Sequence, residues 1–168
     1  MQTATTEIAD TIGKFISEVT PEVISTMLSW EAPAEIPFLP NDSAHSFTIG
    51  NINGSIGFGG LICGTLFFSV SLTQAAEMAS ALLGEPADPE SRECLDVVGE
   101  LTNMMAGGIK TRLNDLGYPM VMSIPNIIRG PSIRVAGKDV AFKVEREFAL
   151  GSGGEAARVI MIGRVSND

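Results

Sequence analysis

The feature that most constrains this chain is a long stretch without charged side chains, from residue 43 to residue 76. Within it, SIGFGGLICGTLFFSVSL is long enough to span a lipid bilayer as a helix. However, this segment contains four glycines, and its second half alternates between apolar residues and mostly smaller ones. A period of two residues is typical of a strand with one buried face. We therefore expect strands at 46–58 and 61–71, with a bulge or tight turn at Asn53-Gly54 and a hairpin at Gly59-Gly60, and no membrane insertion.

A first helix is expected before these strands. Apolar residues recur at three- and four-residue spacing over residues 6–29. Thr20-Pro21 predicts either a kink in this helix or a fresh start, with the threonine as cap and the proline in the first turn. The segment EAPAEIPFLPND (31–42) holds three prolines, so it is expected to be a connection without regular structure.

Two more helices are expected after the hairpin. The sequence from Ser71 to Gln74 has the form of a capping box, and the helix that it begins is expected to end near Gly84. Asp88 can then cap a longer helix with Pro89 in its first position. Gly117 is expected to end that helix, because glycine favours the conformation that closes a helix.

The rest of the chain has the pattern of strands. Residues 120–130 predict a strand that Pro125 interrupts, and residues 140–148 and 157–165 predict a hairpin around the turn at 151–155. The predicted order is α-β-β-α-α-β-β-β. Because strands and helices do not alternate, this order favours an α+β fold with an antiparallel-rich sheet packed against long helices. The basic residues of the last strands are interpreted as a solvent face: Lys143, Arg146, Arg158 and Arg164.

Length and composition fit one domain over residues 1–168, with loose ends at 1–5 and 166–168. The formal net charge is −9, and Lys14 and Arg92 are the only bases among the first hundred residues. Such an acidic surface repels phosphate backbones, so nucleic-acid binding is not expected. The two cysteines form no metal or disulfide pattern and the start of the chain is polar, so a cytoplasmic setting is expected. His45, the single histidine, has no triad context and is interpreted as structural.

The segment ECLDVVGELTNMMAGGIK (93–110) predicts a helix with two different faces. At about 100° per residue, seven apolar side chains share one broad side. They are Cys94, Val97, Val98, Leu101, Met104, Met105 and Ile109. A narrow polar stripe lies opposite, flanked by Gly99 and Ala106. It consists of Asp96, Glu100, Asn103, Gly107, Lys110 and Asn114.

The small residues of this helix leave two interpretations open. Each glycine inside a helix costs about 1 kcal/mol relative to alanine. Gly107 and Gly108 either let another part of this protein pack closely, beside a stripe that is simply solvated, or they let a partner approach the helix. The pattern alone does not decide between them.

A longer string of residues resembles a known family. It consists of Asp96-x3-Glu100-x2-Asn103-Met104-x-Ala106-Gly107, followed by Ser123-Ile-Pro125 and then Gly130. The string is similar to the signature of the CheC/CheX/FliY chemotaxis phosphatases, in which an Asp or Ser precedes Glu and Asn on a helix and a proline follows. The resemblance covers roughly residues 45–165, and residues 6–29 match more loosely.

One feature places the chain nearest to the CheX-like members. CheC-like members carry a second Glu-x-x-Asn on the first helix, whereas here Glu18 is followed by Pro21 and Glu22 by Ser25. One site per chain is the CheX arrangement, and the resemblance also implies a homodimer. Gly108 departs from the family, because relatives commonly have an asparagine there.

The resemblance implies a phosphatase that hydrolyses the aspartyl phosphate of a CheY-type receiver domain. It assigns catalytic roles to Asn103, which would orient the attacking water, and to Glu100, which would pair with the receiver's lysine. Asp96, Gly107 and Lys110 are expected to form the docking face for the partner. No metal or cofactor of its own is expected, because the receiver supplies Mg²⁺. The alternative is a binding module that docks a receiver or another signalling protein through the same helix without turnover.

Overall fold

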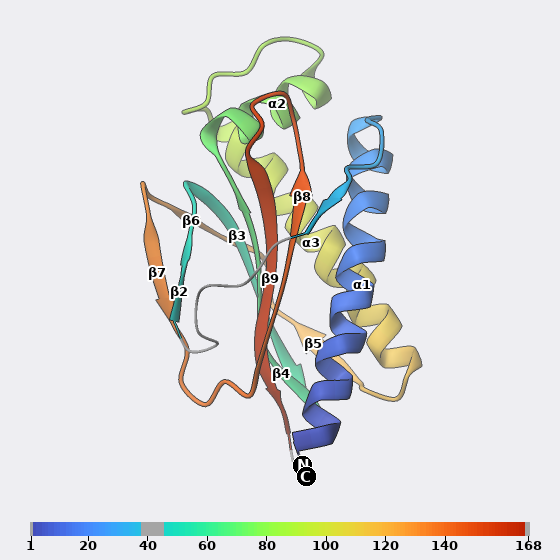
Figure 1. The fold of residues 1–168 in the computed structure, drawn as a ribbon. Coiled ribbons are helices and arrows are strands. Elements are labelled where there is room, and N and C mark those ends of the chain that lie inside the picture. The colour runs from blue at the N-terminus through green and yellow to red at the C-terminus, as the bar shows by residue number, and fades with distance from the viewer. Residues whose placement is uncertain (1, 38–45, 167–168) are drawn as a thin grey trace.

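The computed structural model describes residues 2–37 and 46–166, which form an α+β fold. A seven-stranded sheet lies at the centre, in the order β1-β8-β9-β4-β3-β5, with β6 also paired to β3, and β2 and β7 form a separate two-stranded sheet. Helices α1 and α3 lie on one side of the large sheet, and the small sheet lies on the other (Figure 1). Every strand pair between described residues is antiparallel, as the sequence predicts.

One helix precedes the first strands, and two more lie between the fourth and fifth strands. The helices are α1 (Gln2–Leu28), α2 (Leu72–Leu83) and α3 (Arg92–Asp115). The strands are β1 (Glu35–Ile36), β2 (Ser46–Ile49), β3 (Ile52–Gly60), β4 (Ile62–Val70), β5 (Met120–Met122), β6 (Asn126–Arg129), β7 (Ile133–Ala136), β8 (Phe142–Ala149) and β9 (Ala156–Val165).

Helix α1 is one continuous helix that contains Pro21, so the prediction of a fresh start at this residue is wrong. It begins at Gln2, four residues earlier than expected, which places residues 2–5 in the helix and not in a loose end. The described part of the proline-rich connection after it, residues 31–37, contains a short strand, β1, that pairs with β8. His45 lies outside the described residues.

The expected strand at 46–58 is two strands that belong to different sheets. β2 pairs with β7, whereas β3 pairs with β4 in the large sheet. The chain changes direction at Gly50-Asn51, and the buried Asn53 fixes this change. Its Nδ2 donates to the carbonyls of Gly50 at 2.7 Å and Ile128 at 3.1 Å. Asn53 and Gly54 themselves lie in the regular ladder opposite β4, so the bulge expected there is absent.

The capping predictions for α2 are confirmed. Ser71 and Gln74 exchange both bonds of the capping box, and Gly84 ends the helix with φ of 73°. Helix α3 begins at Arg92 and not at Pro89. The reason is that Asp88 closes a tight turn instead, with its Oδ1 accepting from the Glu90 backbone N–H at 2.8 Å.

The C-terminal half contains the predicted strands, together with β7, which was not predicted. Pro125 separates β5 from β6, both of which pair with β3, and β8 pairs with β9 as a hairpin. The interpretation of Lys143 and Arg158 as a solvent face is wrong. The Lys143 side chain is 7% exposed and lies 3.3 Å from Glu145, which also contacts Arg158 at 2.5 Å. These residues face the second, smaller apolar core under β2 and β7.

Candidate functional site

Helix α3 joins the main core through the face that the periodicity predicts. Six of the seven predicted apolar side chains are buried, and Met104 is half-buried. Close packing against the sheet depends on Gly54 of β3, because a Cβ there would come within 1.8 Å of Thr102 Oγ1 on the helix. The core therefore fixes which side of α3 is turned outward.

Glu100 and Asn103 lie on that outward side, one helical turn apart. Glu100 is exposed and Asn103 is half-buried. Their side chains make no hydrogen bond and no ion pair with any of residues 2–37 and 46–166. A carboxylate and an amide thus point out of the helix with their polar atoms available to a partner. The spacing of the two residues alone could not predict that their side chains have no partner among the described residues.

The other predicted members of the stripe differ in their surroundings. Asp96 lies 3.9 Å from Arg92, and both side chains are largely exposed, at 69% and 88%. Such a pair contributes little to stability, because water screens it. Lys110 is half-buried. Asn114 has a structural role, since its Oδ1 accepts from the Met120 backbone N–H at 3.1 Å.

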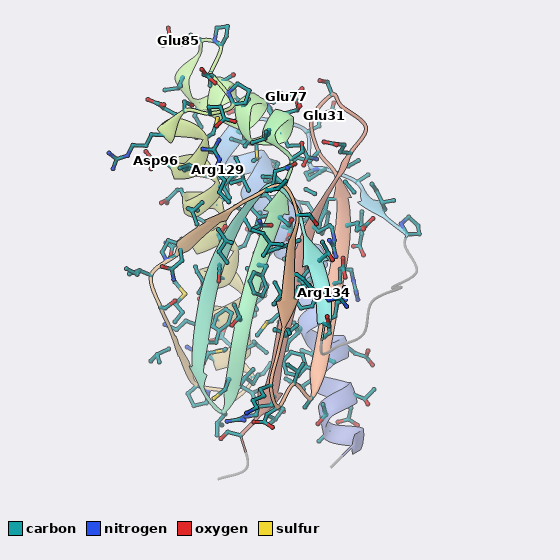
Figure 2. All side chains as sticks on the ribbon, turned by 90° about the vertical axis from the view of Figure 1, so that its left-hand side faces the viewer. Glu31, Glu77, Glu85, Asp96, Arg129 and Arg134 are labelled. Atoms are coloured by element: carbon teal, nitrogen blue, oxygen red, sulfur yellow. The ribbon has the colours of Figure 1, made fainter. Side chains whose placement is uncertain are left out.

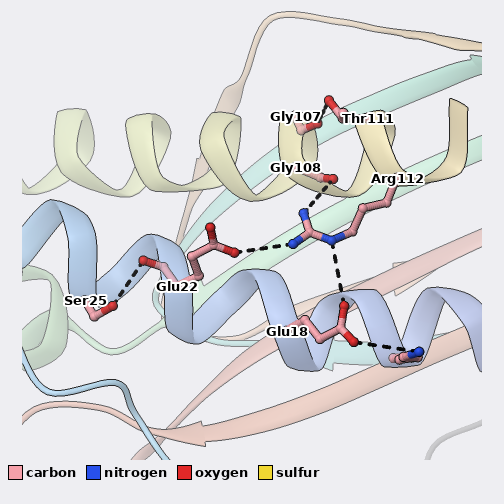
Figure 3. A network of polar contacts seen from close by, with 8 residues as sticks. Glu18, Glu22, Ser25, Gly107, Gly108, Thr111 and Arg112 are labelled. Atoms are coloured by element: carbon pink, nitrogen blue, oxygen red, sulfur yellow. Dashed lines mark hydrogen bonds and ion pairs between the residues drawn. The ribbon is translucent and has the colours of Figure 1, made fainter. Parts of the chain in front are cut away.

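The two neighbouring glycines have different surroundings, which bears on the interpretations left open by the sequence. A Cβ on Gly108 would come within 2.9 Å of Val19 Cγ1 on α1, so this glycine serves packing inside the protein. A Cβ on Gly107 would meet nothing within 4 Å. The Gly107 carbonyl accepts from Thr111 Oγ1 at 3.0 Å, on the far side of α3 from α1 in Figure 3. Packing inside the protein therefore explains Gly108 but not Gly107.

Arg112 links α1 to α3, and this residue was not identified from the sequence. Its guanidinium lies 3.3 Å from Glu22 and 3.8 Å from Glu18 (Figure 3). It also donates to the Gly108 carbonyl at 3.3 Å. Glu18 and Glu22 are the two glutamates of α1 at which a second Glu-x-x-Asn motif fails. Their carboxylates are engaged with Arg112, unlike that of Glu100.

The downstream part of the motif lies beside the same helix. β5 and β6 both pack against α3, and the loop between them carries Ser123 and Pro125. Ser123 Oγ accepts from the Gly57 backbone N–H at 3.0 Å and donates to the Ile124 carbonyl at 2.9 Å. The bond from Gly57 holds the loop against β3. The loop that carries Ser123 and Pro125 thus joins two strands that both contact α3.

Two further observations concern metal sites and membrane spans. In residues 2–37 and 46–166, no three His, Cys, Asp or Glu side chains are grouped so that they could hold a metal ion. Within the same residues, none of the helices combines the length and the apolar character that crossing a membrane requires.

An antiparallel sheet with two long helices on one side is the fold of the CheC-like class. A CheC-like superfamily protein from Shewanella sp. PV-4 matches with a TM-score of 0.73 and 26% identity, over 91% of this chain and 97% of that one. A chain in the CheX-CheY-BeF3-Mg+2 complex from Borrelia burgdorferi also matches with a TM-score of 0.73. Its identity is 20%, over 90% of this chain and 96% of that one, and shows the fold alone.

Sequence comparison narrows the class to one family. The family model "Chemotaxis phosphatase CheX" matches residues 52–145, which include both Glu100 and Asn103. A relative from Thermotoga maritima, the CheY-P phosphatase CheX, is 31% identical over 90 residues, covering 53% of this chain and 58% of the relative. The chain therefore belongs to the CheX family, as the motif predicts.

Proposed function

We propose that this protein hydrolyses the aspartyl phosphate of a CheY-type receiver domain. The observation that carries the proposal is the exposed Glu100 and the half-buried Asn103 on α3, neither of which has a partner within the described chain. Two relatives support it. The Thermotoga maritima relative is a CheY-P phosphatase, and the Borrelia burgdorferi structure contains CheX together with CheY.

The proposed chemistry needs positioning more than a nucleophile. An acyl phosphate is already reactive, so the main task is to hold a water molecule in line with the phosphorus atom. The Asn103 carbonyl can accept a hydrogen bond from this water, while its NH₂ group donates to another acceptor. Asn103 would therefore orient the water inside the active site of the receiver.

Glu100 has the wrong charge to approach a phosphoryl group without a cation beside it. We assign it to an ion pair with the lysine of the receiver, which anchors the helix and offsets the repulsion. Asp96, Gly107 and Lys110 would extend the docking face, with Gly107 leaving room for the receiver backbone. The Mg²⁺ ion would belong to the receiver. A homodimer and a cytoplasmic setting, both expected from the sequence, remain predictions.

The experiment measures phosphate release from phosphorylated receivers of the same genome, with and without this protein. We expect faster release with the wild-type protein and loss of the acceleration in Glu100→Ala and Asn103→Ala. Asp115→Asn is a matched control, because it removes the charge of another exposed carboxylate on α3. If a receiver binds but the lifetime of its phosphate is unchanged, the phosphatase hypothesis fails and the protein is the non-catalytic binding module.

A further inference from the structure

A groove of about 250 Å³ lies between α2 and α3 and continues from the site. Leu82 and Leu83 line it from α2, and Glu93, Asp96 and Glu100 line it from α3. Its floor is apolar and includes the buried Val97. Glu100 therefore belongs both to the groove and to the proposed catalytic pair.

The two leucines are not needed for the core. Leu82 is 47% exposed and Leu83 is 49% exposed, whereas Met78 and Ala79 on the same helix bury against the core. Large apolar side chains left half in water at a concave surface are typical of a binding site for another apolar group.

The charge around the groove is acidic. All three charged residues that line it are carboxylates, and Arg92 neutralises Asp96 only weakly at 3.9 Å, since both side chains are largely exposed. Glu85 comes directly after Gly84, the residue that ends α2, and Figure 2 shows it at the same end of the molecule as Asp96. An occupant that fits must bring an apolar side chain flanked by lysine or arginine.

We propose that this groove determines which receiver the protein recognises, by taking up an apolar side chain with basic neighbours from the receiver surface beside the phosphorylation site. This inference rests on the proposed function. A receiver whose active-site lysine pairs with Glu100 must cover the mouth of the groove, because the Glu100 side chain forms part of its wall. Apolar contact in the groove supplies affinity, and the carboxylates select basic surfaces and speed encounter.

Other occupants fit the charges less well. A second copy of this chain that docked groove to groove would bring an identical acidic rim against the first, and like charges repel. A nucleic acid or an anionic membrane is repelled for the same reason. A basic protein surface is the occupant that complements the groove.

The test compares the double variant Leu82→Ser/Leu83→Ser with Leu116→Ser. Leu116 is a matched control, since it is 56% exposed and lies after α3, away from the groove. Binding is titrated with a receiver carrying beryllium fluoride in place of the phosphoryl group, and phosphate release is measured at saturating protein. We expect the Kd to rise about 100-fold in the double variant, about 10-fold for each leucine. The rate of phosphate release at saturating protein stays unchanged in the double variant. Leu116→Ser leaves both the Kd and this rate unchanged.

The outcomes separate this inference from the proposed function. An unchanged Kd in the double variant, with phosphate release intact in the wild type, overturns the groove alone. Binding that depends on the leucines but never accelerates phosphate release supports the groove and overturns the phosphatase. A self-association of the protein that the double variant abolishes, with receiver binding unchanged, overturns the inference in favour of a second copy. If the double variant unfolds at a lower temperature than the wild type, the single variant Leu83→Ala takes its place. It is expected to raise the Kd about 10-fold.

Discussion

Replacing Gly107 with alanine is expected to make the protein more stable and less able to bind its partner. The structure leaves open space where the new methyl group would lie, so the variant gains the helix preference of alanine, about 1 kcal/mol. For a chain of this size, that corresponds to a rise in melting temperature of roughly 2–4 °C. If a receiver approaches the backbone at this position, the same methyl group creates overlap that costs about 1–3 kcal/mol, which corresponds to a Kd weaker by roughly 5- to 150-fold.

Gly108→Ala is the matched control for this prediction. Its methyl group would overlap Val19 of α1 at 2.9 Å, so an overpacking cost of about 1–3 kcal/mol cancels or exceeds the same helix gain. Thermal unfolding and receiver titration are measured on both variants. The reasoning is refuted if Gly107→Ala stabilises the protein yet binds the receiver as tightly as the wild type, because the glycine would then have no part in docking.

Two further predictions concern stability. Glu145→Ala removes the partner of the nearly buried Lys143 and of Arg158. The free energy of unfolding, measured by denaturant titration, should fall by about 3–5 kcal/mol. A fall below about 1 kcal/mol would show that water reaches these three side chains. Gln74→Ala removes the side-chain acceptor of the Ser71 backbone N–H and two bonds from Nε2 to loop carbonyls, and should cost about 2–4 kcal/mol. An unchanged denaturation midpoint would contradict that role for the glutamine.

The sequence predicted best what depends on short-range pattern. The two faces of α3 follow from the helical period, and the ends of α2 follow from the chemistry of Ser71, Gln74 and Gly84. The hairpin of β3 and β4 follows from the alternation of residues in β4 and from the Gly59-Gly60 pair before it. These features are local, so neighbouring residues carry enough information to specify them.

Features that depend on distant residues were predicted wrongly or not at all. The division between β2 and β3 requires Asn53 to bond with Ile128, which lies 75 positions further along the chain. The burial of Lys143 requires the small sheet to cover the second face of the large one. The alternation pattern predicts that a lysine in such a strand is exposed, because the pattern carries no information about a distant element that covers the strand.

The candidate site also combines features that neighbouring residues determine with features that depend on distant residues. Spacing places Glu100 and Asn103 on one side of a helix, and family resemblance suggests their roles. Only the structure shows that neither side chain has a partner in the described chain, that Gly107 is open while Gly108 is packed, and that two leucines from α2 adjoin Glu100. Each of these facts depends on how elements far apart in sequence come together.

The most direct test of the central claim is the rate of phosphate release from a phosphorylated receiver at saturating protein, for the wild type and Asn103→Ala. If Asn103 positions the water, its loss should lower this rate about 100-fold and leave the Kd for the receiver nearly unchanged. An equal rate for the two proteins would contradict the assignment of Asn103 and the mechanism built on it.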